Sequence, residues 1–213
     1  MTFGDIIKTI APPALNPAGI AFNGKNLLVA CGGDGNIHEI DRQTGSSVRS
    51  FPYIGIQLGL ECLEDGRLLQ GNGTNLIYLT DLQGNLIRTF PGINTYVYGI
   101  TDTEGGIFIQ TAYDTVGALN SLLIYREFSR LAPEIRRVNT AVGLWALIGL
   151  CFDGKDLYAG RYTGVTGIMK FSIDGELIEQ AAFPDRPMGV TFDGKNLWVT
   201  NDVTDLIYCM SVN

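Results

Sequence analysis

The stretch Gly189-Val-Thr-Phe-Asp-Gly-Lys-Asn-Leu-Trp-Val199 decides the fold, because the chain repeats this phrase at a regular spacing. Close variants are Gly19-Ile-Ala-Phe-Asn-Gly-Lys-Asn-Leu-Leu-Val-Ala30 and Gly149-Leu-Cys-Phe-Asp-Gly-Lys-Asp-Leu-Tyr-Ala159, and weaker ones start at Gly59 and Gly99. The leading glycines are 40, 40, 50 and 40 residues apart. A period of about 40 residues that contains only strand-length apolar runs is typical of propeller blades.

Each repeat divides into four short strands. A turn with Asn23-Gly24, Asp65-Gly66, Asp153-Gly154 or Asp193-Gly194 separates the first strand from the second, and such pairs favour hairpins because both residues tolerate positive φ. The third strand alternates, as in Ile37-His-Glu-Ile40. The fourth is represented by Val48-Arg-Ser-Phe51 and Leu86-Ile-Arg-Thr-Phe90. We therefore expect four-stranded antiparallel blades.

The fifth repeat lacks its fourth strand, and the N-terminus supplies a match. The sequence Gly4-Asp-Ile-Ile-Lys-Thr-Ile10 is similar to Gly84-Asn-Leu-Ile-Arg-Thr-Phe90. An open blade edge would expose a row of unpaired backbone groups. We therefore predict an all-β fold in which residues 1–213 form one five-bladed β-propeller, closed by the N-terminal strand joining the C-terminal blade. The blades are expected at about 19–58, 59–98, 99–148, 149–188, and 189–213 together with 1–12. An open stack or a sandwich of hairpins is the alternative.

Composition narrows the class of protein without choosing a function. The chain has 27 glycines in 213 residues, roughly twice the usual ~7%, which is consistent with many tight turns. Its net charge of −7 disfavours nucleic acid, and neither a basic membrane-binding face nor a long apolar span occurs. The N-terminus does not resemble a secretory signal, so we expect a cytoplasmic protein or a part of a soluble assembly. Four cysteines without metal-site spacing predict buried free thiols.

The phrase Pro187-Met-Gly-Val-Thr-Phe-Asp-Gly-Lys-Asn-Leu-Trp-Val-Thr-Asn201 resembles the repeats of the YVTN/NHL-type propeller superfamily. The resemblance covers essentially the whole chain and is weaker in the third repeat. It implies a propeller, but that superfamily includes binding scaffolds, SMP-30-type lactonases, virginiamycin B lyase-like enzymes and five-bladed plant-type glutaminyl cyclases. The lyase-type histidine has no counterpart here, and the cyclase-type Phe-Thr-Gln-Gly-Leu opening is missing.

Two sets of loops are expected to surround one end of the propeller axis. One set joins neighbouring blades, and the other joins the second and third strands of each blade. They carry aromatic, amide and charged side chains that suit a protein or a sugar. The candidate binding residues are Tyr53, Tyr96, Tyr98, Tyr113, Trp145, Arg161, Tyr162, Asn201 and Asp202. Turn formation and rim packing are the alternative roles of these residues.

The third repeat departs from the others by ten extra residues, near 113–121 and 128–137. Irregular length on one blade marks either a functional loop or tolerated drift. Arginines gather there, and they either steer an acidic partner or protect a blade edge. These arginines are Arg126, Arg130, Arg136 and Arg137.

A catalytic site is harder to assemble. The single histidine, His38, lies in a third strand, so no nucleophile and histidine pair is expected. Glu61 lies on an inner strand and can point toward the axis, and we expect Asp102, Asn201 and Asp202 near it. Such oxygen ligands suit a hard cation such as Ca²⁺. This set, with Glu61 and Asp102 as metal ligands, belongs to the alternative of a metal-dependent hydrolase or lyase.

The leading interpretation is a binding or assembly module that is not an enzyme. It needs no cofactor, and its partner would be a protein or a glycan held by the axial-face loops or the third blade. A lectin with one pocket per blade is a version of this hypothesis, but the blade loops differ from one another. The sequence does not identify the ligand.

Overall fold

The fold was analysed in a computed structural model of the chain. The structure describes residues 1–55, 58–71, 75–91, 97–103, 106–113, 120–129, 131–143 and 147–212. For residues 113, 120, 122, 141 and 143 only the backbone is described. All regular elements are β-strands, and within the described chain no helix long and apolar enough to cross a membrane occurs.

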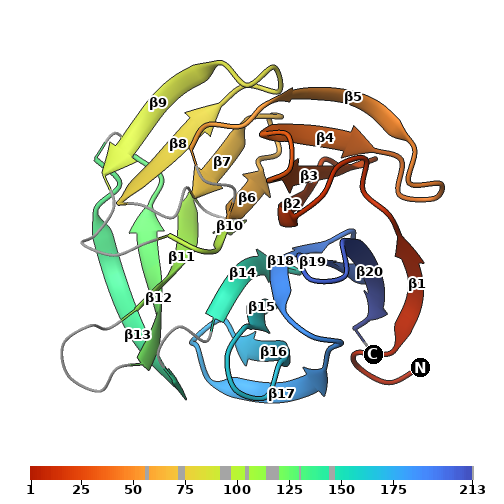
Figure 1. Cartoon of the computed structure of the whole chain (residues 1–213). Coiled ribbons are helices and arrows are strands. Elements are labelled where there is room, and N and C mark those ends of the chain that lie inside the picture. The colour runs from red at the N-terminus through yellow and green to blue at the C-terminus, as the bar shows by residue number, and fades with distance from the viewer. Residues whose placement is uncertain are drawn as a thin grey trace.

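Five four-stranded antiparallel sheets stand around a common centre, which confirms the predicted five-bladed propeller (Figure 1). Blade 1 contains β2 (Pro17–Phe22), β3 (Leu27–Cys31), β4 (Asn36–Ile40) and β5 (Ser47–Pro52). Blade 2 contains β6 (Gly59–Cys62), β7 (Leu68–Gly71), β8 (Leu76–Thr80) and β9 (Leu86–Pro91). Blade 3 contains β10 (Ile100–Thr103), β11 (Ile107–Tyr113), β12 (Asn120–Glu127) and β13 (Glu134–Gly143).

Blade 4 contains β14 (Leu147–Phe152), β15 (Asp156–Arg161), β16 (Gly167–Ser172) and β17 (Leu177–Ala182). Blade 5 contains β18 (Pro187–Phe192), β19 (Asn196–Asn201) and β20 (Leu206–Ser211), and its outer strand is β1 (Ile6–Ile10). The third blade has the longest strands, and this lengthening accommodates part of its extra residues.

The chain termini meet in blade 5, as the repeat offset predicts. β1 pairs antiparallel with β20, so that Thr9 lies opposite Tyr208 and Ile10 opposite Ile207. The backbone N–H of Gly4 donates to the carbonyl oxygen of Ser211 (3.0 Å). Figure 1 shows the two ends of the chain side by side. The ring is therefore closed by strands from opposite ends of the sequence.

The direction of the inner strands defines two ends of the ring. Each inner strand is entered from the outer strand of the preceding blade, so β2, β6, β10, β14 and β18 all run the same way. We call the end where they begin the mouth end, and the end where the first strand of each blade turns into its second the turn end. The turn at residues 23–26 and those at 153–156 and 193–196 share one construction, in which Asn23, Asp153 and Asp193 each accept two backbone N–H groups.

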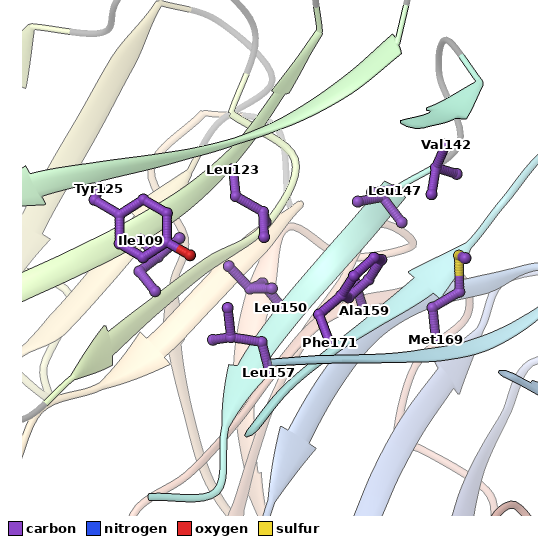
Figure 2. Close-up of a cluster of buried hydrophobic side chains, with 10 residues drawn as sticks. All are labelled: Ile109, Leu123, Tyr125, Val142, Leu147, Leu150, Leu157, Ala159, Met169 and Phe171. Atoms are coloured by element: carbon purple, nitrogen blue, oxygen red, sulfur yellow. The ribbon is translucent and has the colours of Figure 1, made fainter. Parts of the chain in front are cut away.

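The hydrophobic core lies between the faces of neighbouring blades. Figure 2 shows the cluster between blades 3 and 4, in which Ile109 and Leu123 of blade 3 pack near Leu150 and Leu157 of blade 4. Comparable clusters fill the spaces between the other blades. All four cysteines are free thiols; Cys31, Cys151 and Cys209 are buried, and Cys62 is partly exposed. Burial of these apolar faces holds the wedges together without a disulfide.

Candidate functional site

Five glycines form a collar near the start of the inner strands. A Cβ at Gly99 would lie 2.6 Å from the carbonyl carbon of Gly149, and a Cβ at Gly149 would lie 2.8 Å from the nitrogen of Val190. A Cβ at Gly189 would overlap the carbonyl oxygen of Ala18, which continues the contacts from blade 5 to blade 1. At four of the five positions a Cβ would lie less than 3.0 Å from backbone of the neighbouring blade, and at Gly59 the nearest atoms would be 3.2 Å away. The collar residues are Gly19, Gly59, Gly99, Gly149 and Gly189.

A second ring follows two residues after the collar, on the same side of each inner strand because side chains alternate along a strand. It consists of Ala21, Glu61, Thr101, Cys151 and Thr191. Glu61 is the single carboxyl group in this ring. Its Oε2 accepts a hydrogen bond from the Thr101 hydroxyl (2.9 Å), and its Oε1 accepts one from the backbone N–H of Cys62 (3.0 Å). The bond from Thr101 joins blade 3 to blade 2 on the turn-end side of the collar, and the bond from Cys62 lies within β6.

Glu61 faces a cavity of about 460 Å³ at the turn end, which it shares with Cys62, Glu64, Asp102, Thr103 and Phe152. Burial raises the pKa of Glu61 to about 8, and the charge of Asp102 acts in the same direction. Burial also raises the pKa of Asp102, with additional repulsion from Glu64 and Asp65. Within the described chain, Glu61, Glu64 and Asp102 form no ion pair. The cavity therefore brings together three acidic side chains that form no ion pair with a cationic side chain of the described chain.

Two smaller cavities each share lining residues with this one. A cavity of about 230 Å³ shares Glu64 and Asp102 with it and reaches Arg67 and Phe128 in the direction of blade 2. A cavity of about 330 Å³ shares Thr103 and Phe152 with it and reaches residues of blades 3 and 4. The two smaller cavities have no lining residue in common. Together the three form an elongated groove across the turn ends of blades 2, 3 and 4, which we call the turn-end groove.

The charged residues at the flanks of the groove are already paired. Arg67 lies 2.6 Å from the Asp65 carboxylate, and Arg136 of blade 3 lies 2.7 Å from the Asp174 carboxylate of blade 4. Arg136 also stacks on the ring of Tyr125, with its guanidinium carbon 4.9 Å from the ring centroid. The groove thus has an anionic centre and neutralised ends with aromatic walls.

The candidate residues at the mouth end have structural partners. Tyr53 is buried, and its hydroxyl lies 2.9 Å from the carbonyl oxygen of Gly71 and 3.2 Å from that of Gly59. Asn201 is also buried, and its amide donates to the carbonyl oxygen of Pro184 (2.6 Å) while its oxygen accepts the N–H groups of Val203 and Thr204. Both residues hold loops in place.

The structure does bring Tyr162 and Asp202 together, through a residue that the sequence did not single out. Arg186 donates to the Tyr162 hydroxyl (2.7 Å) and to both carboxylate oxygens of Asp202 (3.1 and 3.2 Å). Arg161, beside Tyr162 in the sequence, lies 3.4 Å from the amide oxygen of Gln180. The carbonyl oxygen of Tyr98 accepts the N–H of Gly149 (3.1 Å). Whether this cluster binds a ligand stays a prediction.

The remaining candidates at this end lie outside the described residues. These are Tyr96, Trp145 and the side chain of Tyr113. Arg130 of the third repeat is outside them as well. Of the other arginines there, Arg126 is buried, and Arg137 pairs with Glu134 (2.7 Å).

The expected cation set is divided between the two ends. Glu61 and Asp102 line the same turn-end cavity, whereas Asn201 pairs with Pro187, the first residue of its inner strand, at the mouth end. Asp202 follows Asn201 and is held by Arg186. Among the described residues, no group of three histidine, cysteine, aspartate or glutamate side chains is arranged to hold a metal ion. Glu61 and Asp102 therefore lie together at the turn end, and Asn201 and Asp202 lie at the mouth end.

Sequence reasoning missed Glu64 and Phe152 as cavity residues. Both occupy repeat positions that were assigned to turns and strands, and they come from blades 2 and 4. An alignment of the repeats could have identified this site. It places the acidic residues Glu61, Glu64 and Asp102 at the same end of the inner strand in two consecutive repeats.

No protein-family model matches the chain, and no curated protein matches its sequence. Solved structures are similar. A glutaminyl cyclase from Myxococcus xanthus is 12% identical, with all of both chains covered and a TM-score of 0.74. Hydrazine synthase from Kuenenia stuttgartiensis is 16% identical over 90% of this chain, with a TM-score of 0.57, and BamB from Moraxella catarrhalis is 14% identical over 95%, with a TM-score of 0.49. The chain spans 57% of that hydrazine synthase chain and 61% of BamB.

These identities are too low to transfer an activity, because one fold carries many functions. The similarity to the Myxococcus xanthus protein, complete in both chains, supports the propeller fold. The likeness to YVTN/NHL repeats remains a resemblance of the repeated phrase, since no family model supports it.

Proposed function

We propose that the chain is a non-enzymatic binding module that holds a basic segment of a partner protein in the turn-end groove. The observation that carries this proposal is the group of three carboxylates, Glu61, Glu64 and Asp102, in the central cavity without a cationic partner among the described residues. Burial is the main cause of the raised pKa of Glu61 and of Asp102, and neighbouring carboxylates add to it; a lysine or arginine side chain placed there would favour the ionised form of both groups. The third blade, which the sequence indicated as a binding element, forms part of this groove.

The shape of the groove supports a chain segment as the ligand. Three cavities in succession, of about 230, 460 and 330 Å³, suit an extended segment better than a compact molecule. Phe128 and Phe152 line the first two, and Tyr125 lines the third, so apolar or aromatic side chains of the partner would find contacts beside the anionic centre. A glycan is the other ligand that aromatic walls favour.

The alternative is a metal-dependent hydrolase or lyase, and one observation favours it. Glu61 and Asp102, which the sequence offered as ligands of a divalent cation such as Ca²⁺, line one cavity. The described chain provides no set of three ligands there, so we derive no catalytic step from this arrangement.

The proposal is tested by calorimetric titration at pH 8.5 with a capped hexapeptide of alternating lysine and glycine. We expect binding that weakens at least about tenfold when Glu61→Gln and Asp102→Asn are combined, because a buried ion pair is lost. The control is Glu179→Gln, which removes one exposed negative charge from β17 and does not line any of the three cavities. The same peptide with glutamate in place of lysine should not bind.

Equal affinity of the double variant and the Glu179→Gln control would contradict the proposal, and so would an absence of binding to the unaltered protein. Calcium ions and neutral oligosaccharides are titrated in parallel. Stoichiometric calcium binding that the double variant loses, without peptide binding, would replace the proposal with the metal-dependent alternative. Saturable binding of an oligosaccharide alone would replace it with the lectin version.

A further inference from the structure

Blade 3 contains a buried positive charge, Arg126, that forms no ion pair among the described residues; Glu134, which lies opposite it on β13, pairs with Arg137 instead. Arg126 on β12 is 1% exposed, and it donates to three neutral oxygens: the carbonyl of Ala132 (2.8 Å), the amide oxygen of Gln110 (2.9 Å) and the carbonyl of Pro91 (2.7 Å). The Phe108 ring covers it, with a distance of 5.3 Å between the guanidinium carbon and the ring centroid. Burial lowers the pKa of Arg126 to about 10, so the group remains charged at neutral pH. A buried charge is costly unless it is paired.

The neighbouring Gln110 adds an unsatisfied donor. Gln110 on β11 is fully buried, and its amide nitrogen has no hydrogen-bond acceptor in the described part of the chain. Exchanging the amide oxygen and nitrogen would not help, because the nitrogen would then face the donating guanidinium of Arg126. A guanidinium has five N–H groups, of which the three acceptors use three. Two N–H groups of the Arg126 guanidinium and the amide N–H groups of Gln110 are therefore left without acceptors beside the positive charge of Arg126.

Blade 2 provides the reference for the same two positions. Gln70 follows Gly59 by the same number of residues as Gln110 follows Gly99, and Thr80 occupies the register position that Arg126 occupies in blade 3. There the amide of Gln70 donates to the Thr80 hydroxyl (2.7 Å) and its oxygen accepts the N–H of Ile54 (3.2 Å). The pair in blade 2 is satisfied and neutral. Blade 3 differs because arginine takes the place of threonine, which adds a positive charge, and because the Gln110 amide nitrogen lacks an acceptor.

We propose that Gln110 and Arg126 form a binding site for a small monovalent anion, either a halide ion or a carboxylate. The groups of Arg126 and Gln110 that lack partners are all N–H donors, and they carry a net positive charge. The ligand that complements them is an anion that accepts hydrogen bonds. The site lies between blades 2 and 3, since Arg126 also bonds to Pro91 of β9. An anion bound there fixes blade 3 against blade 2 and stabilises the folded ring.

The test compares Gln110→Glu with Gln70→Glu by thermal unfolding in buffers of constant ionic strength. Gluconate, which is too bulky for an interior site, is exchanged stepwise for chloride, bromide or acetate. The unaltered protein should gain a saturable increase in Tm of roughly 5 °C. Gln110→Glu supplies its own carboxylate to Arg126, so it should have a higher Tm in gluconate and no anion dependence. Gln70→Glu places a charge beside no cation and should lower Tm in every buffer while keeping the anion dependence.

The ion that produces the increase identifies the ligand as a halide or a carboxylate. A flat Tm in the unaltered protein would overturn the proposal. An anion dependence that survives in Gln110→Glu would also overturn it, because the effect would then arise elsewhere. The proposal would also be overturned if Gln110→Glu lowered the Tm as much as Gln70→Glu does. Such a result would show that no unpaired cation faces position 110.

Discussion

At the scale of single residues, the same side chain type serves different purposes according to its place in the repeat. Asp153 and Asp193 hold the turn with one carboxylate oxygen, and the other oxygen accepts a bond from Tyr158 (2.9 Å) or Trp198 (2.8 Å). Asp193 also pairs with Arg42 of blade 1, which contributes to lowering its pKa. Glu61 has no such partner, and burial raises its pKa instead. The first group stabilises the fold, whereas Glu61 forms no ion pair among the described residues and is an acidic group that a cationic ligand could ionise.

Glu61→Gln should stabilise the free protein at alkaline pH. The pKa of Glu61 is raised to about 8 from an ordinary value of 4.5, so the folded state binds a proton that the unfolded state releases, and stability falls as pH rises between these values. Glutamine removes this loss. We expect a gain of about 2 kcal/mol at pH 9, reduced from the full shift because the side chain is partly exposed, and little change at pH 4.

Urea unfolding at pH 4, 7 and 9 measures this difference. A Glu61→Gln variant that is less stable than the unaltered protein at pH 9 would show that the carboxylate makes a stabilising contact instead. Glu179→Gln serves as the control, since it makes the same substitution at an exposed position of β17.

The sequence identified Tyr53, Asn201 and Asp202 as loop residues but could not tell a loop-holding role from a binding role. Amides and tyrosines hydrogen-bond to backbone as readily as to ligands, and only their burial and partners distinguish the two. Arg186 was overlooked because it carries no repeat signal, although it connects Tyr162 with Asp202. Residue roles of this kind depend on contacts between segments distant in sequence.

At the scale of elements, the repeat predicted the strands well because each blade repeats the same turn and alternation. The Asn-Gly and Asp-Gly pairs ended the inner strands where expected, and Phe51 and Phe90 mark the buried ends of outer strands. The period did not reveal why each repeat begins with glycine. The structure gives the reason, since the inner strands approach so closely that a side chain at the collar would overlap the next strand.

Gly189→Ala should therefore be strongly destabilising. The added methyl group would overlap the carbonyl oxygen of Ala18, which belongs to a neighbouring inner strand and cannot move without opening the ring. We expect a loss of about 3 kcal/mol. Gly24→Ala is the matched control, because a Cβ there meets open space and only its φ of 86° opposes alanine, at a cost of about 1 kcal/mol.

Chemical unfolding of both variants at one pH is sufficient for this comparison. If alanine costs no more at position 189 than at position 24, the collar is looser than the contacts indicate. The separation of the mouth end from the turn end would then lose its physical basis.

At the scale of the whole molecule, ring closure was predictable and the binding groove was not. The missing strand of the last repeat and the matching N-terminal segment are both visible in the sequence. The groove combines Glu61, Asp102 and Phe152 from three blades, and it arises only when the blades are placed side by side. The similarity of the repeats allowed the architecture to be predicted from the sequence. The groove depends on residues that differ between the repeats at the turn ends.

Closure of the ring by β1 is the claim on which the collar and the groove depend, and a disulfide tests it directly. Lys8 lies opposite Cys209 in the β1 and β20 pair, and the Lys8 amine lies 5.8 Å from the centroid of the Trp198 ring, which neighbours Cys209 in the sheet. Antiparallel partners are close enough for a disulfide. Oxidised Lys8→Cys should form an 8–209 bond within one chain, detected by peptide mass mapping, and should unfold at a higher temperature. Failure to form this bond, or bonds only between chains, would contradict the closed ring. Thr9→Cys, which lies opposite Tyr208 and not Cys209, should not cross-link.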